Sequence, residues 1–325
     1  MQNTQISSHA ETSLTIAPGA NPTRPRIVRA ADMPFAQGPG ESGAFLMTGA
    51  ETAGRVTIAV AEIDVNAGPP PHVHADAEEI FLVQSGALEL LANGEIVEAR
   101  AGDVAYLARG EAHRFRGLDS GETNRMHAIV APSGFEEFMK RWIPLFDNGA
   151  PDMNEAVRLC NEYNIALYPS DDLAPPPPAQ SHTKLIRAGS QESLSVLGTN
   201  VTVLLRATDT QGRYALVRIE GPRDSGPPLH LHELEDELFL IEEGSVEFTL
   251  GHDTVVAEMG DVVWGPRNHA HTFRIISDYA RITVFITPGG VEQFFVECAQ
   301  MENPHPAELV ALSERFGISY PQMAS

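Results

Sequence analysis

The sequence predicts an all-β protein with accessory helices, built as two tandem jelly-roll β-barrels that are each followed by a helical pair. The first observation is an internal repeat, because segments 68–86 and 226–244 align without a gap. The second is a series of short alternating apolar runs separated by turn residues, which is typical of a small antiparallel barrel. The third is a change to helical spacing after each series. A repeat of this length indicates a duplicated domain.

Residues 1–40 precede the first series of strands. They are rich in Ser, Thr, Ala, Pro and Gly and show no apolar periodicity. Such a composition favours an extended N-terminal arm over a regular element. We expect this arm either to stay mobile or to lie across a neighbouring surface, as a clasp within the chain or as a swap between chains.

Residues 41–169 form the first expected domain, a barrel with its helices. Short strands are expected at 56–60, 80–83, 87–91, 104–107 and 126–130, with turn residues between them. After Pro132, apolar residues recur at helical spacing in two groups, which predicts two helices packed outside the barrel. These groups are Phe135, Phe138, Trp142 and Leu145, and then Met153, Ala156, Val157 and Cys160.

Residues 170–182 contain four consecutive prolines and predict a stiff linker without regular structure. Residues 183–325 form the second expected domain and repeat the order of the first. Strands are expected between residues 184 and 287, and helices at about 290–301 and 306–316.

Length and charge limit the possible partners. A chain of 325 residues can bury two separate cores. A formal net charge of −22 argues against nucleic acids and anionic membranes, since both recruit basic surfaces. The first 35 residues have no apolar segment of the signal-peptide type, and no run of 18 apolar residues occurs, so we expect a cytoplasmic location. Neither Cys160 nor Cys298 belongs to a Cys-x-x-Cys pair, so both are expected to be reduced thiols.

Two sets of three histidines and one glutamate repeat at the same spacing. Residues two apart on a strand project from one face, so the first two histidines of each set can reach one point. Three imidazoles and one carboxylate suit a divalent transition metal, namely Fe, Ni, Co, Mn, Cu or Zn, in one or both barrels. The expected metal ligands are His72, His74, Glu79 and His113 in the first half, and His230, His232, Glu237 and His271 in the second.

Two of these assignments have a competitor. Glu78 lies beside Glu79, but only Glu79 keeps the repeated spacing to the glycine that follows. His269 lies two residues before His271, but the repeat places Glu111 opposite His269. We therefore expect Glu79 and His271 to be the ligands.

Several side chains could form the walls of a pocket at each site. Phe81 and Phe239 share strand parity with the candidate glutamates, so each faces either the metal or the core. Tyr106 and Trp264, on the strands that lead to the last histidines, have the same two alternatives. His127 lies on the closing strand of the first barrel and could be a polar pocket group that the second half lacks.

The spacing of the candidate ligands resembles the two motifs of the cupin superfamily. Both halves meet the first motif, His-x-His-x4-Glu-x6-Gly. The second motif, Gly-x5-Pro-x-Gly-x2-His, is met except that Ala108 replaces its Pro in the first half and Asn268 replaces its second Gly in the other. Both departures lie in the turn before the last ligand. The resemblance covers most of the chain and implies two cupin barrels.

Among two-domain cupins the chain is most similar to the quercetin 2,3-dioxygenase group. It shares the four-residue gap between the second His and the Glu, and a Pro-x-Gly-x-Glu-x-Phe segment after each barrel. This gap argues against oxalate decarboxylases, and the carboxylate ligand argues against gentisate-type enzymes. The resemblance implies a metal-dependent oxidoreductase that uses O2 to open a flavonol-like or other enolisable or phenolic aromatic ring. Glu79 or Glu237 would be the catalytic general base.

Two other classes of function stay open at this point. One is an oxygen-independent metal cupin, such as an isomerase, cyclase or decarboxylase. The other is a pirin-like or storage-type bicupin without activity, which is less favoured because all eight ligands are present. The expected partners are a small-molecule substrate and O2, and the chain is expected to be a monomer or a homodimer.

Overall fold

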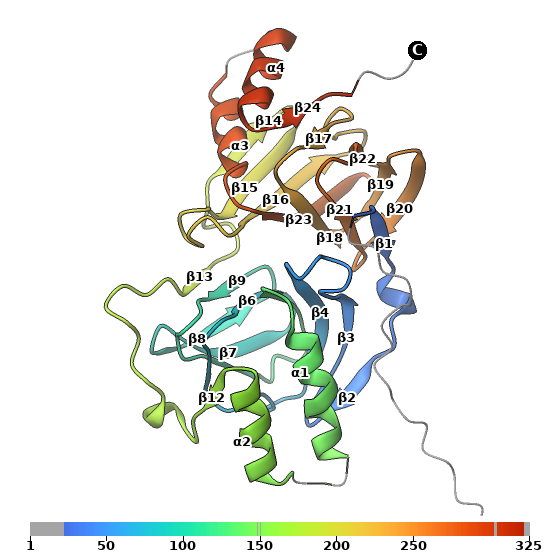
Figure 1. The fold of residues 1–325 in the computed structure, drawn as a ribbon. Helices are drawn as coiled ribbons and strands as arrows, with labels where there is room; N and C mark the ends of the chain where they lie inside the picture. Colours follow the sequence, from blue (N-terminus) through green and yellow to red (C-terminus); the bar gives the residue numbers. More distant parts are fainter. Residues whose placement is uncertain (1–22, 148, 150, 302–303, 322–325) are drawn as a thin grey trace, which may run out of the picture.

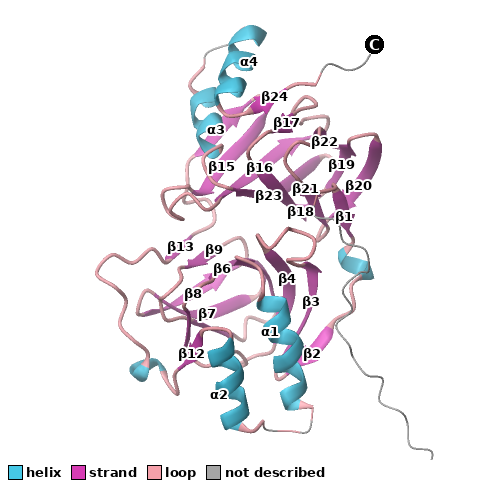
Figure 2. Cartoon of the chain, viewed as in Figure 1, coloured by secondary structure: helices cyan, strands magenta, loops and turns pink. Residues whose placement is uncertain are grey.

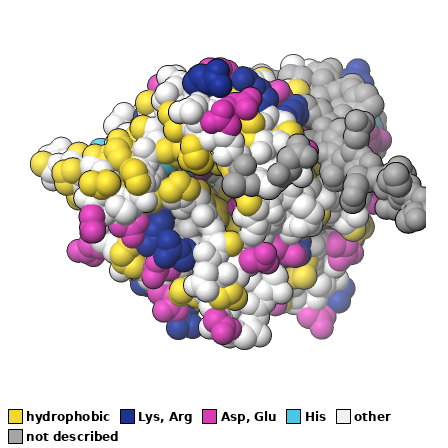
Figure 3. All heavy atoms as spheres, turned by 90° about the horizontal axis from the view of Figure 1, so that it is seen from below, with side chains coloured by type: hydrophobic (Ala, Val, Ile, Leu, Met, Phe, Trp, Pro, Cys, Tyr) yellow, Lys and Arg dark blue, Asp and Glu magenta, His cyan; other side chains and the backbone are white. Residues whose placement is uncertain are grey.

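The computed structural model describes residues 23–147, 149, 151–301 and 304–321, which form two β-barrels that each carry a helical pair (Figure 1, Figure 2). The predicted fold class, all-β with accessory helices, is confirmed. No helix among these residues is long and apolar enough to cross a membrane. On the face shown in Figure 3, acidic side chains are spread widely, in keeping with the net charge of −22.

The first half contains most of its strands before its helices. Its elements are β1 (Arg26–Val28), β2 (Ala36–Gly38), β3 (Glu41–Met47), β4 (Thr57–Ile63), β5 (His72–His74), β6 (Glu78–Ser85), β7 (Ala87–Ala92), β8 (Glu95–Arg100), β9 (Val104–Leu107), β10 (Arg114–Gly117), β11 (Asn124–Ala131), α1 (Phe135–Trp142), α2 (Met153–Glu162) and β12 (Ile165–Leu167).

The second half repeats this order. Its elements are β13 (Lys184–Ile186), β14 (Ser193–Val196), β15 (Thr199–Leu205), β16 (Ala215–Pro222), β17 (Leu231–His232), β18 (Asp236–Glu243), β19 (Ser245–Leu250), β20 (Asp253–Glu258), β21 (Val262–Gly265), β22 (His271–Ile275), β23 (Tyr279–Thr287), α3 (Glu292–Ala299), α4 (Pro306–Arg315) and β24 (Ile318–Ser319).

Each barrel combines a seven-stranded sheet, a three-stranded sheet and a short two-stranded ladder. Alternate residues of the large sheets point to opposite faces. On β6, Ile80 and Leu82 join a hydrophobic core that also contains Leu238 and Leu240 of β18, so this core is shared by both halves. The intervening Phe81 belongs to a second core within the first barrel. Both faces of each large sheet are therefore buried.

The two large sheets exchange a strand. β1 pairs with β21 of the second barrel, and β13 pairs with β9 of the first. An aspartate holds the residues that follow each exchanged strand: Asp261 accepts from the Ala30 N–H at 3.0 Å, and Asp103 accepts from the Ala188 N–H at 2.8 Å. Arg29 and Arg187 bind the same two aspartates at 2.8 Å.

This exchange corrects two expectations from the sequence. The described part of the N-terminal arm contains the short strands β1 and β2, which were not expected, whereas the alternative of a clasp within the chain is confirmed, because β1 crosses to the second barrel of its own chain. Strand 184–186, expected in the second barrel, lies in the sheet of the first. Residues 1–22 of the arm lie outside the described residues. The domain limits at 40/41, 169/170 and 182/183 stay predictions. Each large sheet contains one strand that lies beyond these limits in the sequence, β1 in the second barrel and β13 in the first.

A buried glutamate fastens the start of each helical pair to its barrel. Glu136 accepts from the Gly49 N–H at 2.8 Å and the Gly134 N–H at 2.9 Å. Glu292 accepts from the Ala207 and Gly290 N–H groups, both at 2.7 Å. The glutamate of the repeated Pro-x-Gly-x-Glu-x-Phe segment thus has a structural role.

Two further details differ from the sequence expectation. Met153 and Val157 of α2 are 59% and 43% exposed, so the buried face of this helix is formed by the expected Ala156 and Cys160 together with Leu159. The Pro-rich linker contains a single 3₁₀ turn, Asp171–Leu173, where no regular structure was expected.

Candidate metal centres

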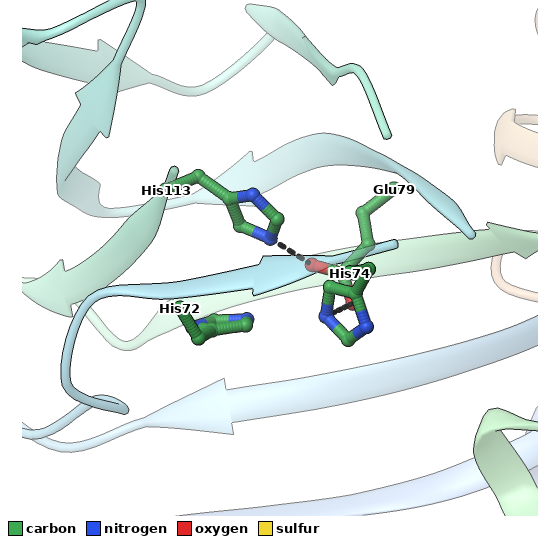
Figure 4. Close-up of side chains that lie close together, drawn as sticks. All are labelled: His72, His74, Glu79 and His113. Carbon is green, nitrogen blue, oxygen red and sulfur yellow. Dashed lines mark ion pairs between the residues drawn. The ribbon is translucent and has the colours of Figure 1, made fainter. Parts of the chain in front are cut away.

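The first candidate centre is assembled from three neighbouring segments. His72 and His74 are the ends of β5, Glu79 is the second residue of β6, and His113 directly precedes β10. Their ligand atoms lie within 4.8 Å of one another, and the four side chains point toward one another (Figure 4). The Glu79 carboxylate lies 3.5 Å from His74 Nε2 and 3.3 Å from His113 Nε2.

The second candidate centre repeats this arrangement. His230 precedes β17, His232 ends it, Glu237 is the second residue of β18, and His271 begins β22. The ligand atoms again lie within 4.8 Å of one another. Glu237 Oε2 lies 3.3 Å from His232 Nε2 and 2.8 Å from His271 Nε2. The structure thus brings together all eight side chains that the sequence singled out.

Backbone hydrogen bonds hold the first and last histidine of each set side by side. The His72 N–H donates to the His113 carbonyl and the His113 N–H to the His72 carbonyl, both at 2.9 Å. His230 and His271 exchange the same bonds at 3.0 and 2.8 Å. The alignment of the ligands is therefore a property of the backbone, which forms an isolated antiparallel bridge in each half.

The chain that follows each helical pair returns to the ligand strand. β12 pairs with β5, placing Ile165 opposite His74, and β24 pairs with β17, placing Ile318 opposite His232. This contact was not predicted. Its sequence signal is the repeated Tyr-Pro at Tyr168 and Tyr320, directly after each returning strand.

A glycine before each ligand strand permits a close backbone approach. Gly68 and Gly226 have φ values of +148° and +157°, which L side chains rarely adopt. A Cβ at Gly68 would lie 2.1 Å from the Phe115 carbonyl oxygen, and one at Gly226 would lie 2.0 Å from that of Phe273. Only glycine fits where the two backbone segments approach so closely. This close approach fixes the path of the chain into each ligand strand.

The imidazole rings are oriented by backbone carbonyls. Nδ1 of His72 and His113 lies 3.0 Å from the carbonyl oxygen of Pro70 and of Glu111. Nδ1 of His230 and His271 makes the equivalent contacts at 2.9 and 3.0 Å. Such contacts favour the tautomer in which Nδ1 carries the proton and Nε2 is free to bind a metal.

Burial and charge favour the metal-binding forms of these side chains. Burial, together with the neighbouring histidines, lowers the pKa of His72 and of His230 to about 3. Burial alone would raise the pKa of Glu79 and Glu237, but the surrounding histidines outweigh it and hold both at about 2. At neutral pH each set therefore offers neutral His72 or His230 beside a carboxylate.

These donor sets fit a divalent transition metal. Nε2 of His74 and of His113 is buried without a hydrogen-bond partner among the described residues. An uncompensated buried polar atom is costly, and a metal ion would satisfy both. The centres also differ, because Glu237 and Glu235 raise the pKa of His232 against the effect of burial, whereas the pKa of His74 is lowered, chiefly by burial.

The competing residue Glu78 has another role. It is buried, lies outside the ligand set, and accepts hydrogen bonds from Arg109 at 2.9 Å and from the Tyr214 hydroxyl at 2.7 Å. It also pairs with Arg213 of the other half. Glu78 is therefore part of an ion-pair cluster between the barrels.

The second half contains an equivalent cluster. Asp236, which precedes Glu237, is paired with Arg267 at 2.9 Å and with Arg55 of the first half at 2.8 Å. His269, the other competitor, also lies outside its ligand set, although its carbonyl oxygen orients the ring of His271.

An apolar cavity opens beside each centre. The first has a volume of about 150 Å³ and the second of about 90 Å³. Among the residues lining the first are His72, His74, Glu79, Phe81, Phe135, Phe138 and Trp142. Among those lining the second are His230, His232, Glu237, Phe239, Phe294, Phe295 and Tyr320.

The wall residues proposed from the sequence divide into two groups. Phe81 and Phe239 line these cavities and also belong to the barrel cores, so both alternatives hold for them. For Tyr106 and Trp264 the metal-facing alternative is wrong. Both are fully buried in the core shared by the two barrels.

His127 also lies away from the candidate metal centres. It lines a third, polar cavity of about 580 Å³ between the barrels, together with Arg218 and Glu242. Its neighbours on β11, Met126 and Ala128, line the first metal-site cavity, so His127 points to the opposite face of the strand. The possibility that His127 is a pocket group at the metal site is therefore excluded.

Comparison with known proteins relates both halves of the chain to one type of domain. A family model described as "Cupin domain" matches residues 59–130 and 216–286, once in each half. A quercetin 2,3-dioxygenase from Bacillus subtilis (strain 168) is 26% identical over 251 residues, which cover 70% of this chain and 71% of that protein.

Solved structures share the fold at lower identity. An oxalate decarboxylase from Bacillus subtilis, described with Mn(II) centres, is 16% identical, with a TM-score of 0.58 over 94% of this chain and 90% of its own. Procruciferin, an 11S globulin from Brassica napus, is 12% identical, with a TM-score of 0.56 over 82% and 85%. At these identities the likeness concerns the fold alone.

Proposed function

We propose that this chain, a two-domain member of the cupin superfamily, is a metal-dependent dioxygenase that opens a flavonol-like or other enolisable aromatic substrate with O2. The observation that supports this most is the position of a three-histidine, one-glutamate set beside a cavity lined by aromatic side chains. Such a cavity suits a planar ring, while the ligand set suits a metal with open coordination positions.

The eight residues of the two sets are the proposed metal ligands. When bound, the metal supplies Lewis acidity that makes an enol or phenol oxygen of the substrate a stronger acid. Glu79 and Glu237 are deprotonated at neutral pH, because their pKa values lie at about 2. Either carboxylate can then accept the hydroxyl proton as a general base. Because the low pKa of these glutamates makes them weak bases, the transfer requires that the metal first acidify the substrate hydroxyl.

The remaining side chains position the ring and exclude water. Phe81, Phe135, Phe138 and Trp142 surround the first cavity, so a bound ring would be shielded from competing hydrolysis. This cavity is the larger of the two, which favours the first barrel as the place where the organic substrate binds.

The test combines metal analysis with oxygen consumption. Protein loaded with each candidate metal is assayed at an oxygen electrode against a flavonol, a catechol and a β-diketone. We expect O2 uptake that matches ring opening, with Glu79→Gln losing more activity than Glu237→Gln. Complete turnover of a substrate under strict anaerobiosis would contradict the dioxygenase and favour an oxygen-independent metal cupin.

A further inference from the structure

Glu41 brings a second carboxyl group into the cavity of the first barrel. It begins β3, where it shares a strand face with Gly43 and Phe45. The alternate residues Ala44 and Leu46 pack in the core between the barrels. Glu41 lines the same cavity as the candidate ligand Glu79, and no other acidic residue is among the described residues of its lining.

The Glu41 carboxyl group has no hydrogen bond or ion pair with any residue in the described part of the chain. The described lining of this cavity also contains no Lys or Arg. Glu41 is partly buried, whereas two almost completely buried carboxylates are bound: Glu78 by two arginines and a tyrosine, Glu136 by two backbone N–H groups. A polar group held against apolar walls without a partner costs free energy, which a ligand can recover.

The duplicated scaffold does not require this group. The repeat places Thr199, the first residue of β15, at the equivalent position in the second barrel. Thr199 also lines its cavity, but its hydroxyl donates to the Val196 carbonyl at 2.8 Å and is thereby satisfied. The free carboxyl is thus a feature of the first cavity only.

The protonation of Glu41 suits a hydrogen bond to an oxygen atom. Burial raises its pKa to about 7, and the nearby Glu79 contributes to this rise. Near neutral pH the protonated form is therefore well populated. A protonated carboxyl can donate to a carbonyl or phenolate oxygen and still accept from a hydroxyl.

We propose that Glu41 is a substrate-binding residue of the first cavity, where its carboxyl group hydrogen-bonds a hydroxyl substituent of the substrate that lies apart from the enol and its neighbouring carbonyl. This inference rests on the proposed function in that it takes a polyhydroxylated aromatic compound as the ligand. It adds that the substrate carries a second oxygen substituent, because an apolar ring alone would leave Glu41 unpaired. Buried polar groups discriminate strongly against ligands that cannot pair with them.

The test measures binding to metal-free, full-length protein, so it needs neither turnover nor O2. Two probes are titrated while tryptophan fluorescence is followed, since Trp142 lines the cavity. Quercetin carries several hydroxyl groups, whereas 3-hydroxyflavone has only the enol and the neighbouring carbonyl. The variants are Glu41→Leu and Glu41→Gln, and Thr199→Val is the matched control in the second cavity.

We expect Glu41→Leu to weaken quercetin binding about tenfold and 3-hydroxyflavone binding less than twofold. Glu41→Gln should lose less, because an amide still pairs with oxygen, and Thr199→Val should bind both probes as the wild type does. Removal of an unpaired carboxyl should leave the melting temperature of Glu41→Leu unchanged or raised, which shows that the variant folds.

Equal losses for both probes, no loss for either, or a wild type that does not bind quercetin would overturn the inference. A lowered melting temperature in Glu41→Leu would instead assign Glu41 to the scaffold and overturn it too. Failure of the proposed function would appear separately, as absence of O2 uptake by metal-loaded wild type.

Discussion

The first and last histidine of each candidate ligand set are held in place independently of any metal. The backbone of His72 is bonded to His113, and that of His230 to His271. Their ring Nδ1 atoms contact carbonyl oxygens, which leaves Nε2 toward the centre of each set. Because the backbone bonds survive truncation of the side chain, single alanine variants should fold and report on metal binding alone.

His72→Ala and His230→Ala are each expected to lose about one metal equivalent per chain. Loss of a residue that only hydrogen-bonds a metal ligand typically lowers metal affinity 10- to 100-fold, and loss of a ligand itself should lower it more. His269→Ala is the control and should keep the full content, because its ring lies outside the ligand set. Elemental analysis after dialysis gives the stoichiometry. Unchanged metal in one of the two variants would show that the corresponding barrel does not hold a metal.

His127 provides a test of pH dependence away from the metal ligands. Burial, together with the charge of Arg125, lowers its pKa from 6.5 to about 3. Between these values the unfolded chain binds a proton at His127 and the folded protein does not, so stability falls as the pH drops below 6.5. At pH 5 this contribution amounts to about 2 kcal/mol.

The prediction is a difference between wild type and His127→Gln. From about pH 7.5 to about pH 5, the free energy of unfolding of metal-free wild type should fall by about 2 kcal/mol more than that of the variant. Urea denaturation at both pH values measures it. The comparison cancels the other titrating groups, among them Glu41, whose raised pKa acts in the opposite direction. Equal falls in both proteins would mean that His127 is protonated in the folded state.

At the residue scale, the candidate sites could be predicted because duplication made the spacing visible. The repeat favoured Glu79 over Glu78, and in the structure the Glu78 carboxylate forms ion pairs with two arginines. The direction of Tyr106 could not be predicted, since both faces of its strand are buried and apolar. Glu41 belongs to no motif, and only the three-dimensional cavity distinguishes it from a surface glutamate.

At the scale of elements, the strands within each barrel were predictable and the exchanged strands were not. β1 and β13 are three residues long, too short for an alternating pattern to identify them. Their signal was present as Arg29-Ala30 and Arg187-Ala188 at the repeat spacing. Those arginines and the following N–H groups bind the aspartate of each Gly-Asp turn, which explains why that turn is repeated.

The loop that leads into the second ligand strand depends on Gly226. Gly226→Ala should lower the free energy of unfolding by at least about 2 kcal/mol, because its Cβ would overlap the Phe273 carbonyl and its φ is strained. Gly121→Ala is the control: its φ is +79°, but nothing lies within 4 Å of the added Cβ, so about 1 kcal/mol is expected. Urea denaturation compares the two. Equal losses would show that the loop shifts to relieve the overlap.

At the scale of the whole molecule, the two barrels form one body rather than two linked domains. A single hydrophobic core joins them, and it includes Tyr106 and Leu82 from one half with Trp264 and Phe285 from the other. The repeat predicted two similar barrels. It could not predict their packing, because a sheet buried on both faces looks the same in sequence whether a helix or a second sheet covers it.

Two equivalent ion pairs between the barrels stabilise this packing. The acidic residue of each pair directly precedes a candidate glutamate ligand in the sequence. Glu78 is paired with Arg213 of the second half, and Asp236 with Arg55 of the first. Both carboxylates are almost completely buried. Removing one partner from a buried pair leaves an undercompensated charge, which costs about 3 kcal/mol.

Arg55→Ala and Arg213→Ala should therefore each lower the free energy of unfolding by about 3 kcal/mol, and by similar amounts because the two clusters are equivalent. Arg223→Ala is the control: its pair with Asp278 is exposed, so less than about 0.5 kcal/mol is expected.

Each interface variant should also weaken metal binding about tenfold at the centre of the opposite half, since Glu78 and Asp236 position the strands that carry Glu79 and Glu237. Urea denaturation and competitive metal titration measure the two effects. Variants as stable as Arg223→Ala would show that Arg109, Tyr214 and Arg267 suffice to neutralise the buried acids and that the barrels do not depend on one another through these pairs.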